Sequence, residues 1–200
     1  TEIRAVITKC TFSYTRQIEM KGLGHAILCG ETLIGDQPFA VLLADDLCDA
    51  PGKGVLAQMV DLYKKYGCSI VAIEEIPKED TNKYGVIAGN EIEPGIYMVK
   101  DMVEKPEPEV APSNLAIIGR YILTPDIFNI IRETKPGKGG EIQITDALLT
   151  QAKKGMVLAF KFEGQRFDCG SIDGFVKATN YFYDKETKKE AAAKKASGAK

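Results

Sequence analysis

Two aspartates follow predicted strands of this chain, at positions where side chains commonly reach a ligand. Asp45 comes directly after the apolar residues 39–44, and Asp168 lies between a predicted strand and a helix, with Gly170 close behind it. In open α/β sheets, ligands bind at the carboxyl ends of the strands, where carboxylate oxygens can hold a hard cation such as Mg²⁺. Each aspartate could equally form a turn or cap a helix, so spacing alone leaves both roles open.

A glutamate and a lysine, Glu104 and Lys105, stand side by side where a predicted hairpin ends at Pro106. The lysine could neutralise a phosphate group, and the glutamate could accept hydrogen bonds from sugar hydroxyls. The same two residues could also form an ordinary exposed ion pair, which contributes little to stability.

A third group of candidates surrounds two glycines, Gly22 and Gly24, at the start of a predicted helix. Backbone N–H groups at such a start can face a ligand, although a simple turn accounts for the glycines as well. Gln17, a few residues earlier, offers a donor and an acceptor together, which is what reading a uracil edge requires. His25 is interpreted as a helix-start or core residue rather than a catalyst.

The elements that would position these residues alternate between strands and helices. Residues 39–44 are a continuous apolar run, typical of a strand that is covered on both faces, and residues 69–73 are predicted to form another buried strand. Val55–Tyr66 between them has an amphipathic helical spacing. This alternation predicts an α/β fold with a Rossmann-like, mixed but mainly parallel sheet flanked by helices. An antiparallel hairpin is expected to be inserted at residues 84–106. Further strands are predicted at 12–15, 115–123 and 156–162, and further helices at 3–7, 25–32, 141–153 and 172–183.

The length and charge of the chain favour one domain that binds small molecules. The 200 residues are 44% hydrophobic, enough for one compact core, which is assigned to residues 1–184. Residues 185–200 are rich in lysine and alanine and are predicted to form a frayed helix end and a solvated tail. The formal net charge is -2 and the charged residues are interspersed, so no basic face for nucleic acid is expected.

The cysteines and the hydropathy suggest a compartment. The five cysteines have no CxxC spacing, and unpaired thiols fit a reducing cytosol. Neither a signal peptide nor an apolar run of transmembrane length is present. A cytoplasmic location without a membrane partner is therefore expected.

Taken together and in order, the motifs of this chain resemble those of the bacterial UTP–glucose-1-phosphate uridylyltransferases. The related thymidylyltransferases share the strand-end aspartate, the Glu-Lys-Pro and the late Asp-x-Gly, whereas GLGHA and SNLAIIGRY resemble the uridylyltransferase branch. The similar segments are KGLGHA at 21–26, the strand end at Asp45, YGV at 84–86, VEKP at 103–106, SNLAIIGRY at 113–121, GEIQITD at 140–146 and DCG at 168–170.

The resemblance implies a nucleotide-diphospho-sugar transferase fold and a magnesium-dependent reaction. In that reaction glucose 1-phosphate attacks the α-phosphorus of UTP in line, forming UDP-glucose and pyrophosphate, and catalysis depends on positioning and charge neutralisation. The family also commonly forms homodimers or homotetramers.

The resemblance further assigns roles to individual residues. Asp46 is expected to tolerate substitution better than its neighbour Asp45. The implied roles are Mg²⁺ binding by Asp45 and Asp168, sugar-phosphate contact by Lys105, glucose binding by Glu104 and the backbone around Gly85, and uracil recognition by Gln17 and Gly22.

One motif of the family has no counterpart in these residues. The family begins with a strand and a glycine-rich G-x-G-T-R loop that wraps the triphosphate, and no such motif occurs here. The chain alone is therefore expected to form no UDP-glucose. The alternatives are a thymidylyltransferase, a metal-dependent glycosyltransferase, or a catalytically incompetent fragment that binds sugar nucleotides.

Overall fold

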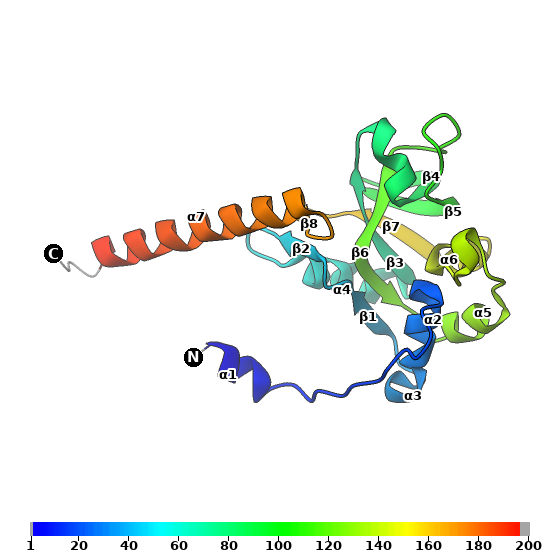
Figure 1. Ribbon diagram of the computed structural model, residues 1–200, viewed down its shortest axis with the longest axis horizontal. Coiled ribbons are helices and arrows are strands. Elements are labelled where there is room, and N and C mark those ends of the chain that lie inside the picture. Colours follow the sequence, from blue (N-terminus) through cyan, green and yellow to red (C-terminus); the bar gives the residue numbers. More distant parts are fainter. Residues whose placement is uncertain (1, 197–200) are drawn as a thin grey trace.

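The computed structural model describes residues 2–196 and contains a six-stranded sheet flanked by helices (Figure 1). The order of the strands in this sheet is β1-β6-β3-β7-β5-β4, and β2 and β8 form a separate two-stranded sheet. The strands are β1 (Phe39–Leu42), β2 (Asp46–Asp49), β3 (Ser69–Glu75), β4 (Gly85–Glu93), β5 (Ile96–Glu104), β6 (Leu115–Leu123), β7 (Val157–Lys161) and β8 (Gln165–Asp168). The α-helices are α1 (Glu2–Ile7), α2 (Gly22–Cys29), α3 (Glu31–Ile34), α4 (Val55–Tyr66), α5 (Ile127–Glu133), α6 (Ile144–Ala152) and α7 (Ile172–Ala196), and the 3₁₀ helices are η1 (Lys78–Lys83) and η2 (Lys138–Gly140).

The prediction of a mainly parallel sheet is wrong, because most neighbouring strands are antiparallel. Within residues 2–196, only β3 and β7 pair in parallel. Strands β1 and β3 do run in the same direction, as a strand–helix–strand unit requires, but β6 lies between them and is antiparallel to both. The alternation of strands and helices in the sequence therefore predicts that β1 and β3 run in the same direction. It does not predict that β6 lies between them, which makes both pairings antiparallel.

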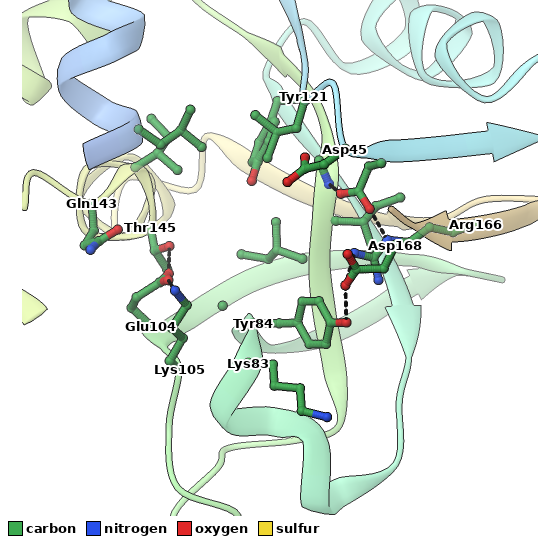
Figure 2. A pocket seen from close by; sticks show the side chains of 18 of the residues that line it. Asp45, Lys83, Tyr84, Glu104, Lys105, Tyr121, Gln143, Thr145, Arg166 and Asp168 are labelled. Atoms are coloured by element: carbon green, nitrogen blue, oxygen red, sulfur yellow. Dashed lines mark hydrogen bonds and ion pairs between the residues drawn. The ribbon is translucent and has the colours of Figure 1, made fainter. Parts of the chain in front are cut away.

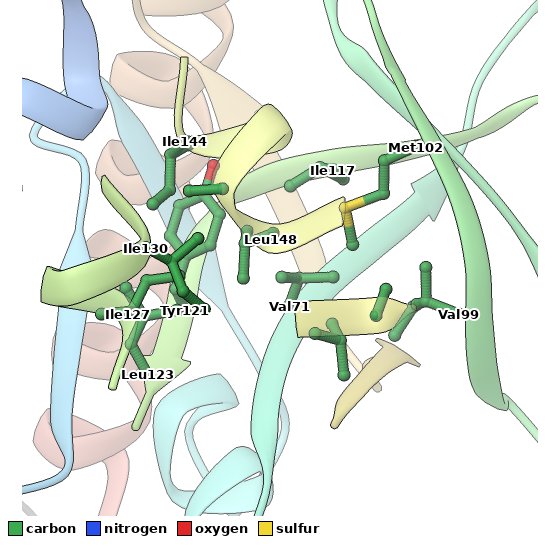
Figure 3. Packing of buried hydrophobic residues seen from close by; sticks show 14 of the residues in the cluster. Val71, Val99, Met102, Ile117, Tyr121, Leu123, Ile127, Ile130, Ile144 and Leu148 are labelled. Carbon is green, nitrogen blue, oxygen red and sulfur yellow. The ribbon is translucent and has the colours of Figure 1, made fainter. Parts of the chain in front are cut away.

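The core consists of two apolar clusters on opposite faces of the sheet. Alternate residues of β3 belong to different clusters, since successive side chains of a strand point to opposite faces. Val71 and Ile73 pack with residues of α2, α5 and α6, whereas Ile70 and Ala72 pack with residues of α4. Figure 3 shows the first cluster, in which α5 and α6 approach the strands. The helices therefore fix the sheet from both sides.

The inserted hairpin is confirmed, but two predicted strands differ from the structure. Strands β4 and β5 pair in antiparallel fashion from Gly85 and Glu104 onward. Strand β1 is not covered on both faces, because its residues alternate between partly buried and exposed, and Leu42 at its end is 52% exposed. Residues 12–15 form no strand, since no neighbouring strand pairs with them.

The last helix is longer than predicted and leads away from the body of the molecule (Figure 1). It runs from Ile172 to Ala196, so the expected start of a tail at residue 185 falls inside the helix. Residues 197–200 of that predicted tail lie outside the described residues. Within the described part of the chain, no helix is long and apolar enough to cross a membrane.

Candidate active site

One cavity of about 340 Å³ contains most of the polar residues that the sequence singled out. Segments far apart in the chain line it: the ends of β5 and β8, the loop between β1 and β2, the centre of β6, and the residues on either side of the start of α6 (Figure 2). The predicted site residues that line it are Asp45, Gly85, Glu104, Lys105 and Asp168.

Asp45 and Asp168 lie close together at one end of this cavity. Pairing of β2 with β8 places Asp46 opposite Asp168, and the backbone N–H of Cys169 donates a 2.7 Å hydrogen bond to the carbonyl oxygen of Asp45. A Cβ atom on Gly170 would lie 3.1 Å from Oδ1 of Asp168 and 3.4 Å from Oδ2 of Asp45. Two carboxylate oxygens therefore face one small space, which the absence of a side chain at residue 170 leaves open.

This arrangement fits a magnesium ion that takes some of its ligands from the protein and the others from a bound substrate. Mg²⁺ is usually held in proteins by one or two carboxylates, with phosphate oxygens and waters as its other ligands. Among the described residues no three His, Cys, Asp or Glu side chains form a metal-binding group. Two carboxylates beside an open cavity agree with such a shared site better than with a metal cage built by the protein alone.

The guanidinium group of Arg166 lies among the carboxylates at this end of the cavity. Arg166 is 7% exposed and forms a buried ion pair with Asp46, whose side chain is 6% exposed. It also lies 3.3 Å from an oxygen of Asp168 and 3.8 Å from an oxygen of Glu74. Because its single positive charge lies near three acidic side chains, Arg166 reduces the repulsion between them.

The same contacts set the protonation of Asp168. Partial burial alone would raise its pKa, but the hydrogen bond from Tyr84 and the charge of Arg166 bring the pKa of Asp168 below its ordinary value. Burial raises the pKa of Glu74. Burial lowers the pKa of Arg166, and the hydrogen bond and charge of Asp46 more than offset this effect. Asp168 is consequently an anion at neutral pH, as a metal ligand must be.

The structure argues against the expectation that Asp46 tolerates substitution. Asp45 is exposed, whereas Asp46 is buried. Besides its ion pair with Arg166, Asp46 accepts a 2.6 Å hydrogen bond from the backbone N–H of Gly119. Its backbone oxygen accepts another hydrogen bond from Arg120. Asp46 therefore joins β2, β6 and β8, whereas the side chain of its neighbour Asp45 is exposed.

Glu104 and Lys105 lie together at another part of the cavity (Figure 2). The hydroxyl group of Thr145 donates a hydrogen bond to Oε2 of Glu104, and Nζ of Lys105 is 3.9 Å from Oε1. Lys105 has a φ of 47°, a left-handed conformation that is uncommon for a residue other than glycine. A Cβ on Gly85 would lie 3.2 Å from both Glu104 and Thr145, so the glycine leaves room for this hydrogen bond.

Gln17 and Gly22 lie outside the lining of the cavity. The side-chain nitrogen of Gln17 donates a 3.1 Å hydrogen bond to the carbonyl of Gly22 and lies 2.9 Å from Nδ1 of His25. The N–H of Gly24 donates to the carbonyl of Ile142 at 2.9 Å, and a Cβ on Gly24 would lie 2.7 Å from that oxygen. The glycines thus allow close packing of two backbone segments.

Several further residues line the cavity that sequence reasoning did not select as site residues. Tyr84 and Thr145 lie in the segments YGV and GEIQITD that resemble the uridylyltransferases, and this resemblance was the only indication in the sequence that they could belong to the site. Arg166 had no such signal, because its role depends on a contact with Asp46, 120 residues earlier. The additional polar residues of the lining are Asp46, Lys83, Tyr84, Tyr121, Glu141, Gln143, Thr145 and Arg166.

Comparison with known proteins agrees with this fold. The UTP–glucose-1-phosphate uridylyltransferase of Pseudomonas aeruginosa is 68% identical to this chain over 183 residues. These residues cover 91% of this chain and 66% of that relative. A crystal structure of a UDP-glucose pyrophosphorylase complexed with UDP-glucose superposes with a TM-score of 0.89 at 64% identity, covering 92% of this chain and 70% of that one. The UTP-bound enzyme of Acinetobacter baumannii has a TM-score of 0.75 at 32% identity, covering 90% of this chain and 65% of that one.

The chain thus spans slightly less than two thirds of the length of the curated relative from P. aeruginosa. The fold is the α/β fold of the nucleotidyltransferases, with a mixed and mostly antiparallel sheet. The model of the nucleotidyl transferase family matches residues 2–185. The chain belongs to the nucleotidyl transferase family.

Proposed function

We propose that this chain forms the sugar-nucleotide site of a UTP–glucose-1-phosphate uridylyltransferase, which makes UDP-glucose and pyrophosphate. The observation that carries the proposal is the single cavity that combines Asp45 and Asp168 with Glu104 and Lys105. A site of this kind can bind a metal–nucleotide at one end and a sugar phosphate at the other. The similarity to a pyrophosphorylase complexed with UDP-glucose supports the same assignment.

In this reaction the residues of the chain position and neutralise the reactants. Asp45 and Asp168 would hold Mg²⁺, which supplies charge neutralisation at the phosphates. Lys105 would contact the phosphate of glucose 1-phosphate and orient its oxygen toward the α-phosphorus. Glu104, held by Thr145, would accept hydrogen bonds from glucose hydroxyls beside the backbone of Gly85. The attack then proceeds in line, without a covalent intermediate on the protein.

Because the chain alone is expected to form no UDP-glucose, the reaction is tested in a protein that joins this chain to the family's G-x-G-T-R segment, by following UTP formation from UDP-glucose and pyrophosphate. We expect UTP to form with Mg²⁺ and to stop forming when EDTA is added. Calorimetric titration with UDP-glucose measures the binding step separately. Release of UDP on addition of a sugar acceptor would instead identify a glycosyltransferase, and preference for thymidine nucleotides would identify a thymidylyltransferase. Absence of UDP-glucose binding would contradict the proposal.

Replacing Lys105 with alanine is expected to raise the KM for glucose 1-phosphate roughly 10- to 100-fold, since a hydrogen bond to a charged group typically contributes about 1.5–3 kcal/mol. The KM for UTP should change much less. Initial rates at varied concentrations of each substrate, measured in the protein that carries the G-x-G-T-R segment, give both constants. The matched control is Lys100→Ala, which replaces an exposed lysine on strand β5, the strand that ends just before Lys105. Equal effects of the two substitutions would show that Lys105 does not contact the sugar phosphate.

Glu104→Gln tests the proposed hydrogen bonds between Glu104 and the hydroxyl groups of glucose. The amide can still accept the hydrogen bond of Thr145 but loses the charge that favours donation from sugar hydroxyls. We expect weaker binding of UDP-glucose and unchanged binding of UTP in calorimetric titrations. Weakened binding of both ligands would place Glu104 elsewhere in the mechanism.

We further propose that Gln17 and Gly22 contact the uracil base, although both residues lie outside the lining of the cavity. Its support is that the side-chain amide of Gln17 is already oriented by Gly22 and His25, and an oriented amide suits base recognition. Gln17→Leu is expected to weaken binding of UTP and UDP-glucose while leaving glucose 1-phosphate unaffected. Unchanged nucleotide affinity would remove Gln17 from the site.

A further inference from the structure

The side chain of Asp168 has its two oxygens in different surroundings. Oδ2 accepts a 2.6 Å hydrogen bond from the hydroxyl group of Tyr84 and lies 3.3 Å from Nη2 of Arg166. Oδ1 accepts a 3.1 Å hydrogen bond from the backbone N–H of Gly170 and faces the space shared with Oδ2 of Asp45. One oxygen is therefore held by side chains of the protein, and the other is directed toward the second carboxylate (Figure 2).

Tyr84 is itself fixed by contacts on both sides. The guanidinium carbon of Arg166 lies 4.9 Å from the centroid of the Tyr84 ring, a distance at which a cation and an aromatic face attract each other. The carbonyl oxygen of Tyr84 accepts a 3.0 Å hydrogen bond from the N–H of Lys105. Tyr84 thus links the backbone of Lys105 to the carboxylate of Asp168.

We propose that Tyr84 is a positioning residue for the metal site: its hydroxyl group holds Oδ2 of Asp168 so that Oδ1 faces Asp45. The inference rests on the proposed function, because it assumes that Asp45 and Asp168 share a divalent cation. The reason is general: a ligating carboxylate that is free to rotate must be ordered when the metal binds, whereas a hydrogen bond to its outer oxygen provides that order in advance. Tyr84 touches neither the metal nor the reacting atoms in this assignment.

The test is direct binding of Mn²⁺, a paramagnetic substitute for Mg²⁺, without turnover. Free Mn²⁺ is measured by electron paramagnetic resonance in the presence of saturating UDP-glucose. Tyr84→Phe removes only the hydroxyl group and is expected to weaken Mn²⁺ binding about tenfold, the lower end of the effect of such outer contacts. Binding of UDP-glucose in EDTA should remain within twofold of that of the unmodified chain.

Tyr181→Phe is the matched control. Tyr181 donates a 2.7 Å hydrogen bond to Asp49, so the control removes the same kind of bond from the same two-stranded sheet, away from Asp168. We expect no change in Mn²⁺ affinity. If both variants weaken Mn²⁺ binding equally, the effect comes from loosening of the sheet, and the proposal is wrong.

A second pair of variants shows whether the effect passes through Asp168. In an Asp168→Asn background, Tyr84→Phe should cause no further loss of Mn²⁺ affinity, because the carboxylate that Tyr84 orients is gone. The same tenfold loss in both backgrounds, or unchanged affinity in Tyr84→Phe alone, would overturn the inference. Failure of the unmodified chain to bind UDP-glucose would instead contradict the proposed function.

Discussion

Asp46→Asn is expected to lower the free energy of unfolding by about 3 kcal/mol, the lower end of the cost of breaking a buried ion pair by removing one partner. The substitution removes the charge that pairs with Arg166, both side chains being less than one tenth exposed. Arg166 keeps its contacts with Asp168 and Glu74, which limits the loss. The buried arginine is nevertheless left with weaker compensation for its lost hydration.

Urea denaturation followed by circular dichroism measures this effect. Asp45→Asn is the matched control, because Asp45 is exposed and surface substitutions usually change stability by about 0.5 kcal/mol or less. A variant of Asp46 as stable as the control would mean that the ion pair with Arg166 adds nothing to the fold.

Asp45→Asn has the opposite expected profile, with a large effect on turnover and a small one on stability. If Asp45 shares Mg²⁺ with Asp168, its loss removes an electrostatic contact at the developing transition state. Such a contact is typically worth about 2.7–4 kcal/mol, which is roughly a hundredfold or more in rate. The fall should persist at saturating substrate, because the lost contact acts on the reaction step.

The measurement is the rate of UDP-glucose formation at increasing Mg²⁺ in the protein that joins this chain to the family's G-x-G-T-R segment. Near-normal turnover of Asp45→Asn at saturating Mg²⁺ would remove Asp45 from the metal site. Denaturation of the same variant separates the two explanations, since a loss of activity with unchanged stability cannot come from unfolding. Asp45 and Asp46 are adjacent in the chain, so the two variants together distinguish a site residue from a structural one.

Local patterns in the sequence determined most of the elements but only part of the polar lining. The spacing of apolar residues predicted α4 at Val55–Tyr66 and β6 at Leu115–Leu123 with the bounds that the structure has. Polar residues at the ends of predicted strands gave Asp45, Glu104, Lys105 and Asp168, all of which line one cavity. These predictions succeed because periodicity and chain turns are properties of neighbouring residues.

Only the tertiary structure decided which strands pair and which of two adjacent aspartates is buried. Strand β6 lies between β1 and β3. The sequences of β1 and β3 do not predict this neighbour, because strands pair through backbone hydrogen bonds, which do not depend on the type of side chain. Asp46 is fixed by Gly119 and Arg166, which lie 73 and 120 residues away in the chain. The sequence by itself determined the kinds of residues available for the chemistry, whereas long-range packing decided which of them are structural and which face the cavity.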